Sequence, residues 1–133
     1  MTYTVTKLTG EPIVIIKAEP PTDDYFDEDA PVLHAQLDAL ASQVQGVLYC
    51  VMDTRLLDIS FSDILLWIDE NHQGLPGTAS DARLRLVVVG EHPLIPTGLK
   101  KVRQKMALDI PHFDTVAVAL AYVRSQLNSL AST

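Results

Sequence analysis

Apolar residues follow two different periods along this chain. In residues 3–8, which are rich in β-branched residues, Tyr3, Val5 and Lys7 would lie on one face of an extended strand and the residues between them on the other face. Residues 13–16 are the apolar run Ile-Val-Ile-Ile. Both patterns are typical of β-strands. Because only the turn sequence Thr-Gly-Glu-Pro at 9–12 separates the two strands, they are predicted to form an antiparallel hairpin.

The longer period predicts helices. Between residues 31 and 46, apolar side chains recur at intervals of four, three and four, which places them on one face of a helix: Leu33, Leu37, Leu40 and Val44. Pro31 suits the first turn of this helix, and Gly46 is expected to end it. The acidic stretch at 23–29 lacks the ligand spacing of a calcium loop, so it is interpreted as a solvated connector.

The middle of the chain contains a continuous apolar run, residues 47–52, that ends at Asp53. Such a run predicts a strand buried on both faces of a sheet. Further on, Ser60 and Asp63 have the spacing of a capping box, which predicts that a helix begins there. Residues 84–89 form another apolar run, closed by Gly90, and predict a further strand.

The last part of the chain continues the alternation. Pro93 and Pro96 are expected to precede a helix, and residues 109–113 are expected to form a short edge strand. Asp114 or Thr115 is then expected to cap a final helix. The predicted order is β-β-α-β-α-β-α-(β)-α. It indicates a single α/β domain over residues 1–133, with a mixed sheet of four to five strands and about four helices.

Charge and composition narrow the possible partners. The chain of 133 residues has a net charge of −7 and one cysteine. An acidic protein repels phosphate backbones, so nucleic-acid binding is not expected. The sequence has neither a signal peptide nor a long apolar run, so we expect a cytoplasmic location and no membrane insertion. A lone cysteine excludes a disulfide within the chain, which fits the same location.

The element order resembles that of STAS-like domains, the fold of bacterial anti-sigma-factor antagonists. The best local match is the segment 51–65, in which a buried strand ends at Asp53 and a short connection leads to serines at the start of the next helix. The characteristic Asp-Ser-Ser/Thr-Gly of the family is replaced by Ser-Phe-Ser-Asp at 60–63. The chain is therefore most similar to a divergent, uncharacterised bacterial branch of this family.

The resemblance implies a role in protein association. In regulatory members, a partner kinase phosphorylates the serine at this turn, which makes Ser60 or Ser62 the candidate phosphosite and Asp53 part of the same regulatory turn. From the residues alone, Ser60 is more simply interpreted as an N-cap, and the neighbouring Asp58 and Asp63 would repel an added phosphate.

Two surface patches are further candidates for partner binding. Leu65, Leu66, Trp67 and Ile68 are consecutive on one helix, which cannot bury all four, so Leu66 and Trp67 are predicted to be exposed or covered by another chain, as in a homodimer. Four basic residues on the helix after Pro96 form a possible anion or partner patch, or simply a solvated helix face: Lys100, Lys101, Arg103 and Lys105.

No residue set indicates a reaction. The four histidines lack metal-ligand spacing, and Cys50 lies inside an apolar run where a core role is expected, so neither a metal, a cofactor nor a catalytic site is predicted. The leading interpretation is a non-enzymatic protein-interaction or regulatory module. The alternative is a carrier or sensor of a small apolar ligand, held in a closed pocket between the sheet and the helices at 60–72 and 93–106.

Overall fold

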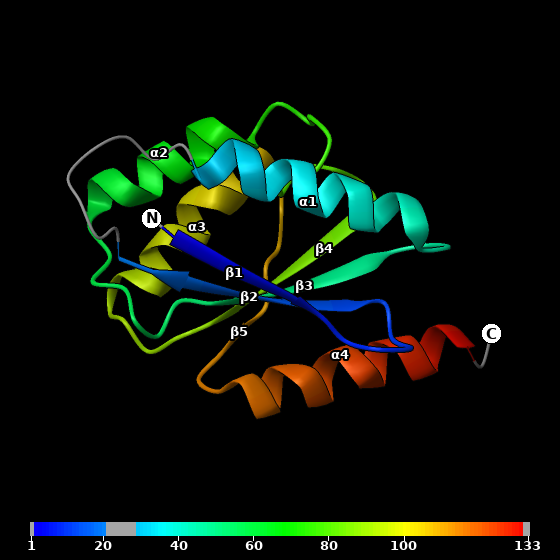
Figure 1. Cartoon of the computed structure of the whole chain (residues 1–133). Coiled ribbons are helices and arrows are strands. Elements are labelled where there is room, and N and C mark those ends of the chain that lie inside the picture. Colours follow the sequence, from blue (N-terminus) through cyan, green and yellow to red (C-terminus); the bar gives the residue numbers. More distant parts are fainter. Residues whose placement is uncertain (1, 21–28, 132–133) are drawn as a thin grey trace.

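Five strands form one mixed sheet with helices on both faces (Figure 1). The computed structural model describes residues 2–20 and 29–131, so most of the predicted acidic connector lies outside the described residues. The elements are β1 Thr2–Lys7, β2 Ile13–Glu19, α1 Asp29–Gln43, β3 Leu48–Asp53, α2 Phe61–Asn71, β4 Leu84–Val89, α3 Leu94–Met106, β5 His112–Phe113 and α4 Val116–Ala131. The predicted class, a single α/β domain with a mixed sheet and four helices, is confirmed.

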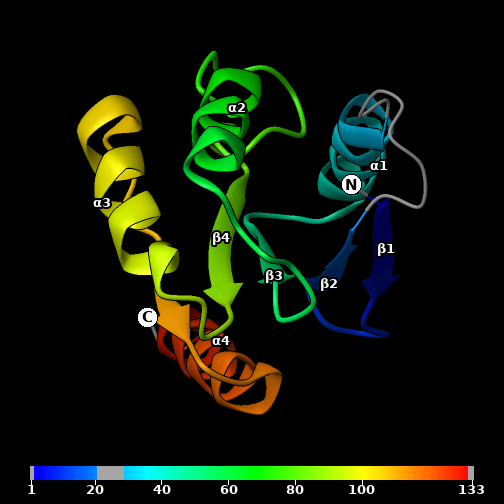
Figure 2. The ribbon, with the colours of Figure 1, turned by 90° about the vertical axis from the view of Figure 1, so that its left-hand side faces the viewer.

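The strands lie in the sheet in the same order as in the sequence, β1-β2-β3-β4-β5. β1 pairs with β2 antiparallel, as the hairpin prediction required, and β2 through β5 are parallel. Each parallel strand is joined to the next strand along the sheet by a helix, and such crossovers are right-handed. Because every crossover moves to the same side of the preceding strand, all three connecting helices lie on one face of the sheet. Accordingly α1, α2 and α3 cover one face of the sheet and α4 covers the other (Figures 1 and 2).

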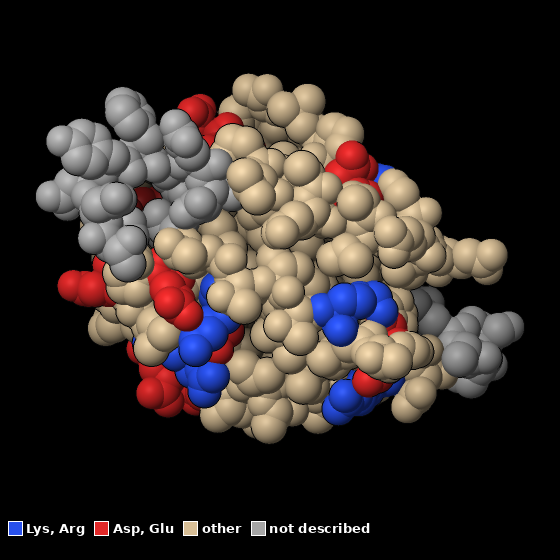
Figure 3. Space-filling model, viewed as in Figure 1, with Lys and Arg blue, Asp and Glu red and all other residues tan. Residues whose placement is uncertain are grey.

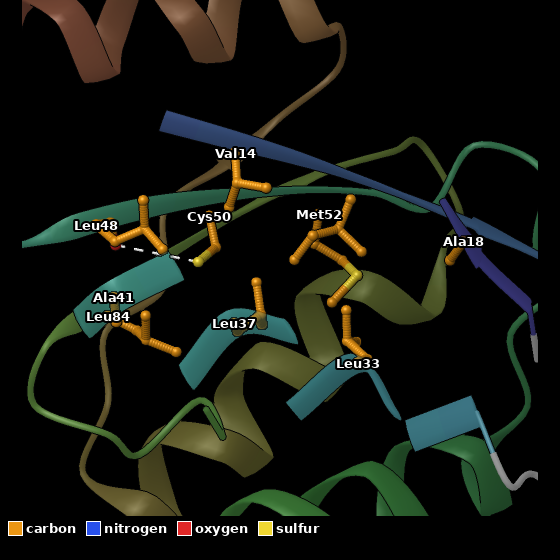
Figure 4. Packing of buried hydrophobic residues seen from close by; sticks show 10 residues of the cluster. Val14, Ala18, Leu33, Leu37, Ala41, Leu48, Cys50, Met52 and Leu84 are labelled. Atoms are coloured by element: carbon orange, nitrogen blue, oxygen red, sulfur yellow. Dashed lines mark hydrogen bonds between the residues drawn. The ribbon is translucent and has the colours of Figure 1, made fainter. Parts of the chain in front are cut away.

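Alternate residues of the central strands supply two separate cores. Cys50 and Met52 of β3 point toward Leu33 and Leu37 of α1 (Figure 4). Val51, between them, points to the other face and packs with the cluster that includes residues of α4. Every residue of β3 is buried, as its continuous apolar run predicted.

Cys50 is a core residue, as predicted. Its side chain is fully buried, and this burial raises the pKa of its thiol to about 12. Because the thiolate is the nucleophilic form, the thiol is inert at neutral pH.

Some element boundaries differ from the sequence prediction, and β2, predicted over residues 13–16, extends to Glu19. α3 begins at Leu94, so Pro96 lies inside the first helical turn, where the missing N–H of proline has no helical partner to lose. The predicted strand at 109–113 shortens to the two residues of β5. Of the two residues predicted to cap α4, Asp114 and Thr115, it is Thr115 that does so: its Oγ1 accepts a hydrogen bond from the Val118 N–H at 3.2 Å.

Candidate functional site

The turn at 60–63 forms the predicted capping box at the start of α2. The Asp63 N–H donates to Ser60 Oγ at 3.1 Å, and the Ser60 N–H donates to Asp63 Oδ2 at 2.8 Å. Such an N-cap stabilises a helix by about 1 kcal/mol relative to alanine. The Ser60 hydroxyl is therefore engaged in the cap, whereas Ser62 is exposed in the first turn of the helix.

Asp53, at the carboxyl end of β3, is held by one neighbour. The Arg55 guanidinium donates to both carboxylate oxygens, at 2.9 Å from Nε to Oδ1 and 2.8 Å from Nη2 to Oδ2, and the Arg55 N–H donates to Oδ1 at 3.1 Å. These hydrogen bonds keep the pKa of Asp53 below its usual range although the side chain is buried. The turn between β3 and α2 therefore contains an aspartate already paired with an arginine and a serine already used as a cap.

The apolar residues of α2 that are exposed are only in part the ones that the sequence predicted. Leu66 is 50% exposed, as expected, but the exposed neighbour is Leu65, at 44%, together with Phe61, at 48%. Trp67 is half-buried instead and packs with Ile64 and Val102. The reason is that α3 lies beside α2, so the buried arc of α2 extends around the helix toward α3 (Figure 2).

The four basic residues lie on α3 as predicted. Arg103 pairs with Asp109, with 3.2 Å between Nε and Oδ1, and both side chains are mostly exposed. Lys100, Lys101 and Lys105 form no ion pair within the described part of the chain. On the face seen in Figure 3, acidic and basic side chains lie in small mixed groups around a wide area free of both.

A cavity lies between the sheet and the two helices α2 and α3. Its volume is about 120 Å³, and it is partly open to solvent. The sheet contributes Met52 and Val88, α2 contributes Ile64 and Trp67, and α3 contributes Val102 among others. The alternative interpretation of the sequence placed a closed pocket between these same elements, whereas the observed cavity is partly open to solvent.

Small residues on two sides leave this space unfilled. Ala18 of β2 and Gly98 of α3 both line the cavity. Gly98 also lets α3 approach α2 closely, because an added Cβ would lie only 3.1 Å from Cδ1 of Ile64. Of the lining residues, the sequence had pointed to Trp67 as part of an interface and to Asp63 as part of the capping box, and it predicted neither of them to line a pocket. The available signal was the presence of these two small residues within otherwise bulky apolar patterns.

A side-chain hydrogen bond joins the two loops that lead into the cavity-lining helices. His92 Nε2 lies 3.0 Å from Asp58 Oδ1, and the Leu94 N–H donates to His92 Nδ1 at 3.1 Å. Since Nδ1 accepts that bond, the ring proton is on Nε2 and is donated to Asp58. This contact connects the segment that carries Leu57 and Ile59 to the start of α3, and all three line or adjoin the cavity.

No group of three potential metal ligands occurs among residues 2–20 and 29–131. Within the same residues, no helix has the length and hydropathy needed to cross a bilayer. No protein-family model, curated protein or solved structure matches this chain. The candidate site is therefore argued from its own geometry.

Proposed function

We propose that the protein binds a small apolar molecule in the cavity between the sheet and helices α2 and α3. The observation that carries this proposal is the cavity itself, which is lined almost entirely by apolar side chains of the sheet and of both helices. Apolar cavities of roughly 150 Å³ stay dry and take up benzene. A cavity of about 120 Å³ suits a ligand of one ring or a short branched chain.

The size of the cavity also limits the affinity. A one-ring ligand has few atoms with which to gain binding energy, so we expect a dissociation constant on the order of 0.1–1 mM, or about 4–5.5 kcal/mol. Binding at this strength suits a sensor or carrier that exchanges its ligand readily. It also sets the concentration range in which the ligand must be tested.

Titration with toluene tests the proposal. Trp67 is the only tryptophan of the chain and it lines the cavity, so its fluorescence should change saturably as toluene binds. Filling the cavity from the sheet by Ala18→Leu, or from α3 by Leu99→Phe, should abolish this change or weaken binding at least tenfold, a loss of about 1.4 kcal/mol.

Ala121→Leu is the matched control, because it makes the same substitution as Ala18→Leu on an exposed position of α4. It should leave toluene binding unchanged. Circular dichroism of each variant separates a filled cavity from an unfolded chain. A wild-type titration without saturation, or unchanged binding in both folded cavity variants, would refute the proposal.

A second candidate function is protein association, with a second copy of this chain as the partner. Four large apolar residues are 44–53% exposed on α2 and the segment before it: Leu56, Phe61, Leu65 and Leu66. α2 carries acidic residues and no basic ones, whereas α3 carries four basic residues and no acidic ones. A two-fold axis parallel to these helices would place α2 of each copy against α3 of the other. The exposed apolar residues would then be buried between the copies, and the acidic residues of α2 would lie near the basic residues of α3.

Sedimentation velocity tests this self-association. The wild-type chain should form a dimer as its concentration rises, less so at high salt, and Leu66→Lys should shift the equilibrium to the monomer by at least tenfold in the dissociation constant. Val118→Lys is the control, because Val118 is 52% exposed on α4, on the opposite face of the sheet. A wild-type chain that stays monomeric at every concentration would exclude this candidate. Protein association is also the role that the resemblance of residues 51–65 to STAS-like proteins implies.

A further inference from the structure

We propose that the ligand of the cavity carries a hydrogen-bond donor, best a primary ammonium group, on its small apolar body, and that Asp63 receives it. This inference rests on the proposed binding of a small apolar molecule in the cavity. Asp63 is the only charged residue among the lining residues that the structure describes. It is half-buried at the start of α2, where the capping box fixes its position.

One oxygen of Asp63 is left for a ligand. Oδ2 accepts the hydrogen bond from the Ser60 N–H at 2.8 Å. Oδ1 accepts no hydrogen bond from any residue in the described part of the chain. A carboxylate is an acceptor only, so the group that completes Asp63 must be a donor.

Thr54, another polar residue that lines the cavity, is also left with acceptor positions only. Its Oγ1 donates its only hydrogen to the carbonyl oxygen of Val89 at 2.8 Å. The lone pairs that remain on this oxygen are acceptors. The Trp67 indole adds one N–H, a neutral donor that does not offset the charge of Asp63.

The charge of the protein favours the same choice. The chain has a net charge of −7, which attracts cations and repels anions. An ammonium group gains a charge-assisted hydrogen bond to Asp63, whereas a carboxylate on the same ring meets a like charge in a poorly solvated place. The inferred order of affinity is therefore ammonium before a neutral ligand, and a neutral ligand before an anion.

Three ligands built on one ring test this order: toluene, benzylamine and benzoate. Trp67 fluorescence and isothermal titration should show that the wild-type protein prefers benzylamine to toluene and binds benzoate weakest. In Asp63→Asn the preference for benzylamine over toluene should fall about tenfold, while toluene binding is retained. The asparagine Oδ1 still accepts the Ser60 N–H, so the cap and the fold are kept.

Asp69→Asn is the control for net charge, because Asp69 lies on the exposed face of the same helix. It should leave the ratio of benzylamine to toluene affinities unchanged. If toluene itself fails to bind, the proposed function is wrong. If toluene binds but the ratio is unaffected by Asp63→Asn, or changes equally in Asp69→Asn, the ligand class inferred here is wrong and the cavity remains a neutral apolar site.

Discussion

Replacing Gly77 with alanine is expected to destabilise the protein by about 3 kcal/mol or more. Gly77 lies in the loop between α2 and β4 and has a φ of +79°, a conformation that costs an alanine about 1–2 kcal/mol. A Cβ at this position would also lie 1.8 Å from the carbonyl oxygen of His34 and 2.6 Å from its carbonyl carbon. Both atoms belong to the backbone of α1, so the clash cannot be relieved by a change of rotamer.

Gly74→Ala separates the two contributions. Gly74 lies in the same loop with a φ of +69°, but an added Cβ would have no atom within 4 Å. Only the conformational cost applies, so we expect a loss of about 1–2 kcal/mol. Urea denaturation followed by Trp67 fluorescence measures both variants, and equal losses would show that the loop does not press against α1 as described.

Asp81→Asn is expected to lower the free energy of unfolding by about 2–3 kcal/mol at neutral pH, because it weakens several charge-assisted hydrogen bonds at once. Asp81 is 8% exposed at the entrance to β4. Its carboxylate accepts from Nη2 of Arg83 at 2.6 Å, from the Arg83 N–H at 3.0 Å and from the Gly77 N–H at 2.9 Å. The residue therefore fixes the same loop that holds Gly77 against α1.

Asp38→Asn is the matched control, since Asp38 pairs with the same guanidinium at 2.7 Å but is 44% exposed. An exposed pair contributes little, so a loss below about 1 kcal/mol is expected. Urea denaturation of the two variants measures the difference directly. Equal losses would mean that burial of Asp81 has no part in its contribution.

The effect of Asp81→Asn should depend on pH in a defined direction. Hydrogen bonds from Arg83 hold the pKa of Asp81 well below its ordinary value of 3.8. The unfolded chain therefore binds a proton before the folded one does, and the stability that the carboxylate contributes is complete above pH 3.8 and lost as the pH falls toward the lowered pKa. The gap between wild type and variant should narrow between pH 7 and pH 3, and a gap that widens would contradict this assignment.

Local patterns were sufficient to predict most of the elements. The capping box at Ser60 and Asp63 involves residues three positions apart, and the buried strand β3 follows from six consecutive apolar residues. In each case the residues whose interactions determine the structure lie close together in the sequence, so the local sequence is sufficient to predict the element.

The candidate site was harder to predict because it depends on contacts between distant segments. Periodicity shows that α2 has an apolar face, but not that α3 lies on one side of it and covers Trp67. Likewise, Gly98 becomes important only because Ile64 of another helix lies opposite. The position of the cavity followed from the order of the elements, whereas its volume and its contact with Asp63 required the packed side chains.

The covering of the sheet on its second face has a consequence for biosynthesis. Among the described elements, α4 is the only helix on that face, and it packs there against residues of β3 and β4 such as Val51, Val87 and Val89. Translation produces all five strands before it produces α4. The nascent sheet therefore has one apolar face exposed to water until residues 116–131 emerge, and its completion must await synthesis of that helix.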